Sequence, residues 1–237
     1  MRSSTESLNF FRSKRLASLL AASAVVVATV APISAAASAH ELRIHTSAQV
    51  TASSLLAKLQ VKGRAPKTGY SRSLFSDGWG SIGSCDTRNF ILSRDLTNLT
   101  WRSGQTCIVA TGVLHDPYTA RIIHFVRGVR TSLAVQIDHV VPVSDAWQKG
   151  AQQWSSSKRY NFYNDPLNLL AVDGPTNGAK SDSDAASWLP PNKSFRCAYV
   201  ARQIAVKAKY SVWVTSAEKQ AMAGILARCP GFKAPRG

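Results

Sequence analysis

Apolar positions divide the chain into short runs separated by turns, and their spacing predicts both helices and strands. A period near 3.6 residues predicts helices over residues 50–59, 87–96, 196–210 and 216–226. Asp86 is a favoured N-cap residue for the second of these helices. Thr215 and Glu218 form a capping box for the last one.

Continuous apolar runs predict strands over residues 107–114, 119–126, 134–143 and 167–172. The turn His115–Tyr118 joins the first two strands into a hairpin. One helix containing Trp147 and Trp154 is expected after the third strand, and a short helix near Asn177 after the fourth. These elements together predict a single α+β domain.

The first 39 residues differ from the rest of the chain. Three basic residues precede an apolar run that ends in Ala37-Ser38-Ala39, which is typical of a secretory signal peptide cleaved after Ala39. A retained membrane anchor is the alternative. Since no later run is long and apolar enough to span a bilayer, we expect a secreted protein without stable membrane association. We expect residues 40–69 to be a mobile basic segment with a short helix, and residues 70–237 to form the domain.

All four cysteines follow the predicted signal peptide: Cys85, Cys107, Cys197 and Cys229. An even number in an exported chain predicts two disulfides, for which three pairings are possible. We favour Cys85–Cys107 and Cys197–Cys229, because each pair joins neighbouring elements. A zinc site is the alternative, but no Cys-x-x-Cys pair occurs and no histidine lies near a cysteine.

The formal net charge is +16. Residues 1–39 hold four of the basic residues and one acidic residue, so the remainder carries +13. Such an excess favours a polyanionic partner, such as nucleic acid or an anionic cell envelope. A solvated basic surface without a partner is the alternative.

Two polar residues, Asp138 and His139, interrupt the apolar run at 134–143. Neither is favoured on a buried strand unless it has partners. A carboxylate is a ligand for Mg²⁺, and an imidazole can act as a base near neutral pH. Asn168 begins the next strand, Asn177 offers an amide oxygen near a helix start, and Lys180 lies three residues further on. An acid, a base, an amide oxygen and a cation together can cleave a phosphodiester.

The order Asp138-His139-Val140-Val141-Pro142, Asn168 and Asn177–Asp182 resembles the HNH (ββα-metal) nuclease motif. The chain from about residue 66 to 230 is similar to the C-terminal domain of GmrSD-type restriction enzymes and to exported bacterial proteins of that branch. The runs that carry this similarity are Cys85–Asn89, His115–Tyr118 and Asp145–Trp147.

The resemblance implies a ββα core at about 134–187, preceded by the hairpin and flanked by helices. It implies that His139 is the general base, that Asp138 and Asn177 are metal ligands, and that Asn168 braces the loop between the strands. Lys180 is expected to contact substrate phosphate. Many HNH enzymes have histidine where this chain has Asn177, which favours Mg²⁺ or Mn²⁺ over Zn²⁺.

Our main hypothesis is therefore a secreted, metal-dependent HNH endonuclease that cleaves DNA, with RNA as a further substrate and with low sequence specificity. We assume a monomer. The alternative is a non-catalytic secreted cationic protein that binds extracellular nucleic acid or the anionic cell envelope. In that case His139 is a core histidine, Asn177 caps a helix, Asn168 ends a turn and Lys180 is solvated.

Overall fold

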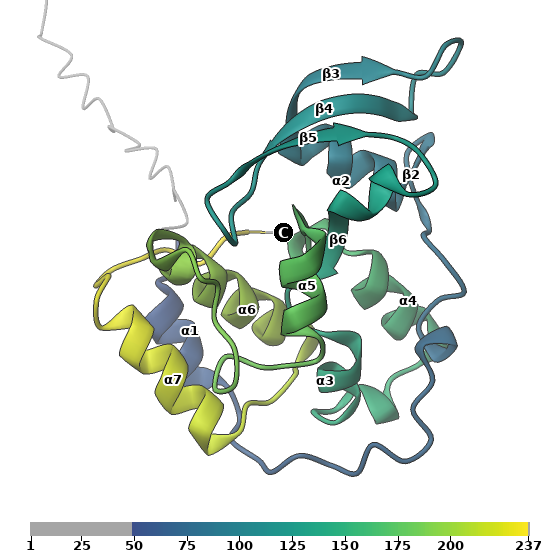
Figure 1. Cartoon of the computed structure of the whole chain (residues 1–237). Helices are drawn as coiled ribbons and strands as arrows, with labels where there is room; N and C mark the ends of the chain where they lie inside the picture. The colour runs from purple at the N-terminus through teal and green to yellow at the C-terminus, as the bar shows by residue number, and fades with distance from the viewer. Residues whose placement is uncertain (1–48, 237) are drawn as a thin grey trace, which may run out of the picture. The chain divides into compact units, whose positions relative to one another are not determined.

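A three-stranded antiparallel sheet forms one end of the fold in the computed structural model, which describes residues 49–236 (Figure 1). The expected signal peptide lies outside the described residues. The sheet has the order β3 (Leu96–Trp101), β4 (Val109–His115) and β5 (Ile122–Val126). The pairing of β4 with β5 confirms the predicted hairpin, whereas β3 was not predicted.

Helix α2 (Thr87–Asp95) packs against this sheet and leads directly into β3. Its N-cap is Asp86, whose side chain accepts a hydrogen bond from the Asn89 amide, as the sequence predicts. A short ribbon of β1 (Ser81–Ile82) and β2 (Cys85–Asp86) precedes the helix.

The centre of the fold is an antiparallel pair, β6 (Val135–His139) and β7 (Leu169–Asp173). Alternate residues of this pair face two different hydrophobic cores. Ile137 and Leu169 belong to a core shared with α2 and the three-stranded sheet, whereas Leu170 belongs to the larger helical core. Both faces are therefore buried, which explains why these strands read as continuous apolar runs. Helix α5 (Gly174–Lys180) follows β7, so this part of the chain has the order strand, strand, helix.

The segment between β6 and β7 contains two helices, where one was predicted. Helix α3 (Val143–Trp147) ends before Gly150, whose φ of 123° is incompatible with a continuing α-helix. A 3₁₀ turn (η3, Ala151–Gln153) then leads to α4 (Ser156–Asn164), which Ser155 caps, and to η4 (Pro166–Asn168). The prediction of a single helix through Trp147 and Trp154 was wrong because a glycine in this conformation stops it.

Helices α6 (Arg196–Tyr210), α7 (Ser216–Leu226) and α1 (Ala52–Lys58) pack against one another below the sheet (Figure 1). The bounds of α6 agree with the prediction, and Thr215 caps α7 by accepting a hydrogen bond from the Glu218 amide. The remaining 3₁₀ turns are η1 (Arg72–Leu74), η2 (Thr131–Ala134) and η5 (Lys193–Phe195). None of the helices in the described part of the chain is long and apolar enough to cross a membrane.

Disulfides join Cys85 to Cys107 and Cys197 to Cys229, which confirms the favoured pairing. The first links β2 to the loop before β4, and the second links α6 to the turn that follows α7. The mixed α+β class and both disulfides are thus as predicted from the sequence.

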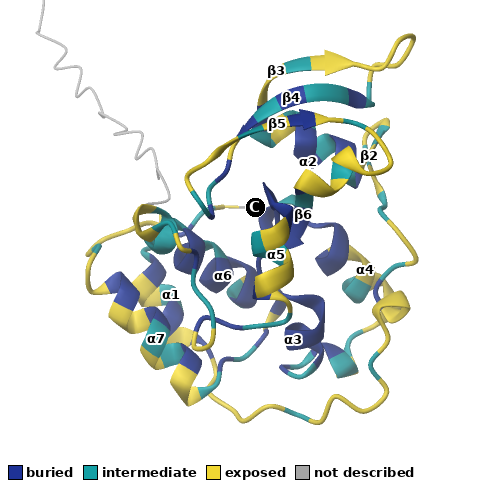
Figure 2. Cartoon of the chain, in the orientation of Figure 1, coloured by how far each residue is buried: buried dark blue, intermediate teal, exposed yellow. Residues whose placement is uncertain are grey.

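A cluster of buried charges ties the helices together. The Lys149 ammonium lies 2.7 Å from Asp145, 2.7 Å from Asp184 and 2.6 Å from Glu218. Lys207 lies 2.9 Å from Glu218 and 3.3 Å from Asp145. Both lysines are inaccessible to solvent, so they depend on these carboxylates to compensate for lost hydration. Figure 2 shows the surrounding elements α3 and α6 as largely buried.

Candidate functional site

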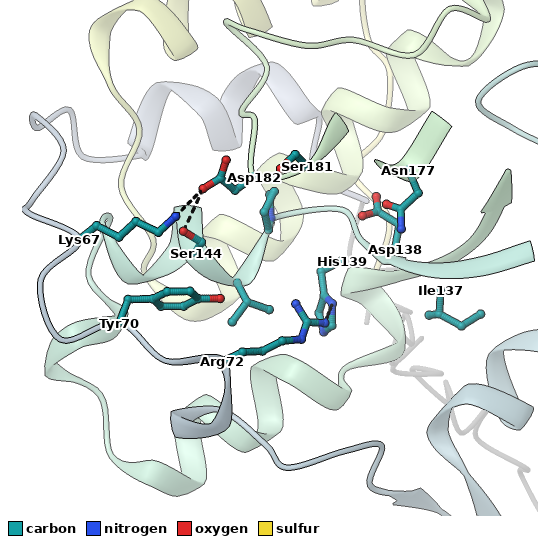
Figure 3. Close-up of a pocket in the computed structure, with 12 residues that line it drawn as sticks. Lys67, Tyr70, Arg72, Ile137, Asp138, His139, Ser144, Asn177, Ser181 and Asp182 are labelled. Carbon is teal, nitrogen blue, oxygen red and sulfur yellow. Dashed lines mark hydrogen bonds and ion pairs between the residues drawn. The ribbon is translucent and has the colours of Figure 1, made fainter. Parts of the chain in front are cut away.

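A polar cavity of about 350 Å³ opens at the end of β6, where the chain leaves the strand (Figure 3). Its walls come from four parts of the chain: the segment before β1, the end of β6, the start of α3, and α5 with the residues that follow it. The lining residues are Lys67, Tyr70, Arg72, Ile137, Asp138, His139, Pro142, Val143, Ser144, Asn177, Ser181 and Asp182. The cavity therefore gathers Asp138, His139 and Asn177, but neither Asn168 nor Lys180 is among its walls.

Asp138 is buried and held from two sides. Its Oδ1 accepts a hydrogen bond from the Lys180 ammonium at 2.9 Å, and its Oδ2 accepts one from the Tyr118 hydroxyl at 2.5 Å. Burial and the neighbouring charge of Asp138 raise the pKa of Tyr118 well above its usual value, so the hydroxyl stays protonated and donates. Because each carboxylate oxygen has two lone pairs, Asp138 keeps the capacity to bind a further group.

His139 points to the opposite face of the strand from Asp138, as expected for consecutive residues. Its ring stacks on Trp79, with centroids 5.7 Å apart and planes inclined by 12°. Nε2 lies 2.8 Å from the carbonyl oxygen of Tyr163. Since a carbonyl can only accept, Nε2 carries the hydrogen and Nδ1 keeps its lone pair.

The surroundings of His139 keep the imidazole neutral. Burial is the main cause, followed by the positive charge of Arg72, and together they lower the pKa of His139 to about 3 although the bond to Tyr163 opposes this. The Arg72 guanidinium reaches toward the ring, with Nη2 3.5 Å from Nδ1 (Figure 3). Nδ1 therefore accepts an N–H of Arg72, and the neutral ring lies beside a cation.

Asn168 is buried behind the site and spans the two strands. Its Oδ1 accepts a hydrogen bond from the Val141 amide at 2.8 Å, and its Nδ2 donates to the Val141 carbonyl at 3.2 Å. Its own backbone carbonyl accepts from the Val140 amide at 2.8 Å. These three bonds fix the turn that immediately follows His139, so the position of Asn168 agrees with a bracing residue.

Asn177 extends from the second turn of α5 into the cavity wall. Its Nδ2 donates to the Gln136 side chain at 2.9 Å, while its Oδ1 has no hydrogen-bond partner among the described residues. Asp173, rather than Asn177, is the N-cap of α5. The alternative that Asn177 serves as the cap is therefore wrong, and a free amide oxygen faces the same cavity as Asp138.

Lys180 has no access to solvent. Its ammonium donates to Asp138 and, at 3.0 Å, to the backbone carbonyl of His139. The alternative of a solvated lysine is therefore wrong. Lys180 lies behind the cavity wall, where its ammonium binds both Asp138 and the backbone of His139.

Asp138 and Asn177 could together hold a divalent cation of the magnesium type. Such ions accept one or two carboxylate or amide oxygens from a protein and complete their shell with water and substrate phosphate oxygens. Within residues 49–236 no group of three or more histidine, cysteine, aspartate or glutamate side chains is arranged to hold a metal. The donors present thus fit an open, oxygen-rich site and do not fit a closed tetrahedral zinc site.

Three lining residues were not assigned to the site from the sequence: Lys67, Tyr70 and Arg72. They lie at the end of the basic segment and the start of the predicted domain, and Arg72 lies 67 residues before the histidine that it approaches. The sequence signal that could have indicated them is the alternation of basic and aromatic residues around Gly69. That signal does not show where the segment folds.

The chain is thus a mixed α+β domain in which a strand, strand, helix unit carries an acid, an imidazole and an amide around one polar cavity. Residues 86–225 match the family model of the C-terminal domain of GmrSD restriction endonucleases. This match covers more than half of the chain, so the chain belongs to that family, which confirms the relation expected from the motifs. The chain is also 40% identical over 183 residues to an uncharacterized secreted protein of Arthroderma benhamiae, covering 76% of this chain and 85% of the fungal protein.

Proposed function

We propose that the protein is a secreted, metal-dependent HNH endonuclease that hydrolyses phosphodiester bonds of DNA with little sequence preference, with RNA as a further candidate substrate. In this proposal β6, β7 and α5 form the ββα core. The observation that carries it is the setting of His139, a neutral imidazole at a polar cavity that Asp138 and Asn177 also line. Membership of a restriction endonuclease family supports nucleic acid as the substrate.

His139 acts as the general base in the proposed reaction. Its Nδ1 removes a proton from a water molecule as the water oxygen attacks phosphorus and the bond to the 3′ oxygen breaks. The Tyr163 carbonyl keeps the ring in the productive tautomer, and Asn168 keeps the following turn in place. A divalent cation held by Asp138 and Asn177 would stabilise negative charge on the phosphate and on the departing oxygen.

Lys180 and Tyr118 position Asp138 rather than contact the substrate. Each donates a hydrogen bond to one carboxylate oxygen, so the carboxylate cannot rotate freely. Lys180 also binds the His139 carbonyl, which links the orientation of the two adjacent functional residues. This differs from the role first expected for Lys180.

Secretion is the second part of the proposal. Two disulfides are stable in an oxidising compartment, and the fungal relative is a secreted protein. The N-terminal sequence of the exported protein should begin near His40. An exported form that still carries residues 1–39 would contradict the predicted cleavage.

A plasmid-nicking assay tests the enzymatic proposal. We expect the purified protein lacking residues 1–39 to nick supercoiled DNA with Mg²⁺ or Mn²⁺ and to be inactive with chelator. His139→Ala should lower the rate by about 10²–10⁴-fold, the usual share of a general base. His124→Ala is the matched control, because His124 is exposed on β5 and outside the cavity. DNA binding without cleavage under any metal would instead support the non-catalytic cationic protein.

A further inference from the structure

We infer that the segment Val61–Phe75, here called the strap, binds the phosphate backbone of the substrate through Arg72 and Lys67. The strap lies before the part of the chain that matches the family model, which begins at residue 86. It nevertheless forms one wall of the cavity that contains His139 (Figure 3). This inference rests on the proposed function, since it assigns the group that would hold the substrate of that site.

The strap is firmly attached to the domain on both sides of the cavity. Before the cavity, Arg64 enters the buried charge cluster, where its guanidinium lies 3.0 Å from Asp145 and 2.7 Å from Asp184. After the cavity, Phe75 is buried between the rings of Trp147 and Phe162, with centroids 6.3 and 6.1 Å away. The residues between these anchors therefore have a defined position.

Backbone and side-chain hydrogen bonds secure the strap around its Arg64 anchor. The Lys62 amide donates to the Val214 carbonyl at 3.0 Å, and the Ala65 amide donates to the Gln148 carbonyl at 2.9 Å. The Gln152 side chain donates to the Pro66 carbonyl at 2.7 Å. The first part of a segment expected to be mobile is thus held against the domain, directly before Lys67.

Arg72 has the setting of an anion-binding residue. It is exposed, it lines the cavity, and it makes no ion pair with any carboxylate among the described residues. Its Nε donates to the Tyr163 hydroxyl at 3.2 Å, and its guanidinium lies 5.0 Å from the centre of the Tyr163 ring. These contacts orient the planar guanidinium and leave further N–H donors free to bind a phosphate, which a guanidinium can bind through two parallel hydrogen bonds.

Lys67 is available for a second phosphate. Its ammonium lies 3.0 Å from Asp182, but both side chains are about half exposed, at 52% and 46%. Ion pairs this exposed are weak and screened by salt, so a polyanion can displace the carboxylate. Two cations on one wall of the cavity, of which Arg72 lies beside the proposed base, suit two phosphates of a nucleic acid strand.

A structural role for Arg72 is the rival explanation, because it packs on Tyr163, whose carbonyl holds His139. The two explanations differ in the salt dependence of binding. Removing one cation that binds a phosphate should lower the slope of log K against log salt by about 0.9 for duplex DNA. Removing a purely structural interaction should leave that slope unchanged.

The test measures binding of a short DNA duplex in chelator, without cleavage, over a range of salt concentrations. Arg72→Gln and Lys67→Gln should each reduce the slope by about one unit, and Arg72→Gln should weaken binding at low salt about 10- to 100-fold. Arg72→Lys should keep the slope. Arg228→Gln is the matched control, because Arg228 is exposed at the end of α7 and outside the cavity. The thermal unfolding midpoint of each variant is measured in parallel.

Slopes that match the control would overturn the inference, as would weaker binding by Arg72→Gln with an unchanged slope. Since the readout is binding, it does not depend on catalysis. Failure of the strap variants together with normal nicking by the unmodified protein would reject the strap alone. Altered slopes without nicking under any metal would support the strap as a nucleic-acid-binding element and reject the endonuclease.

Discussion

Substitution of Asn168 tests how the turn after His139 is stabilised. The Asn168 side chain has no access to solvent and makes two hydrogen bonds to the backbone of Val141. Truncation in Asn168→Ala removes both bonds and leaves the Val141 amide and carbonyl buried without those partners. Each unsatisfied buried group costs about 1–3 kcal/mol. The expected loss is therefore about 2–5 kcal/mol, a large part of the 5–15 kcal/mol typical of a folded domain.

Chemical denaturation, followed by intrinsic fluorescence, measures this loss as a change in the free energy of unfolding. A thermal scan should show a midpoint lowered by about 5–15 °C, since 1 kcal/mol corresponds to about 2–4 °C in a domain of this size. Asn192→Ala is the matched control. The Asn192 side chain donates one bond, to the Pro117 carbonyl, and accepts two, from the amide and the hydroxyl of Ser194, but it is only partly buried.

Water can replace the lost partners of Asn192, so the control substitution should cost about 1 kcal/mol, as is usual for a helix cap. If both variants lose the same stability, burial of the Asn168 bonds is not what stabilises the turn after His139. The bracing role would then have no energetic basis.

Three further predictions concern stability. Burial alone would raise the pKa of Asp184, but the hydrogen bond and the charge of Lys149 outweigh the effect of burial and lower that pKa. The ionised carboxylate therefore stabilises the fold at pH values above its unfolded pKa of about 3.9. This contribution is lost as the pH falls through the lowered pKa of the folded state. The free energy of unfolding should fall on acidification, and less steeply in Asp184→Asn; equal steepness would contradict this. Lys149→Met should cost about 3–5 kcal/mol in urea denaturation, because it leaves three buried carboxylates short of a partner, whereas Lys58→Met on the surface should cost less than about 0.5 kcal/mol. Replacing Cys197 and Cys229 by serine should cost about 3–4 kcal/mol, and an unchanged thermal midpoint would exclude a stabilising role for that disulfide.

The helices that could be predicted accurately carry their own local signals. The caps at Asp86 and Thr215 form the hydrogen bonds that their residue types suggest, and they fix where α2 and α7 begin. Helix α6 has a continuous apolar face that the larger core covers. In each case the decisive interaction joins residues only a few positions apart, so the sequence alone contains it.

Other parts of the fold depend on contacts that local patterns do not show. Strand β3 has exposed threonines and an asparagine, and only pairing with β4 makes it a strand. The break between α3 and α4 follows from the conformation of Gly150, although the tryptophan spacing on either side is compatible with one helix. Apolar periodicity was insufficient at both places because tertiary structure decided the outcome.

In the candidate site, too, some residues could be found from the local sequence, whereas others depend on tertiary contacts. Asp138 and His139 could be found because two polar residues within an apolar run require partners. The partners themselves could not, since Tyr118 lies 20 residues before Asp138 and Lys180 lies 42 residues after it. Spacing on α5 placed Lys180 near the site but could not show whether its ammonium faces the substrate or the carboxylate.

The positive charges of the chain fall into two groups, those buried in ion pairs and those exposed to solvent. Within residues 49–236 three lysines are completely buried, at positions 149, 180 and 207, and each has at least one carboxylate partner, since an unpaired buried ammonium would be too costly. These lysines stabilise the fold and add nothing to the attraction of a polyanion. Arg72 differs in both respects, since it is exposed and has no carboxylate partner among the described residues. A cation that stays hydrated until an anion replaces the water is suited to binding substrate, and Arg72 holds that position 3.5 Å from the nitrogen of His139 that would accept the proton.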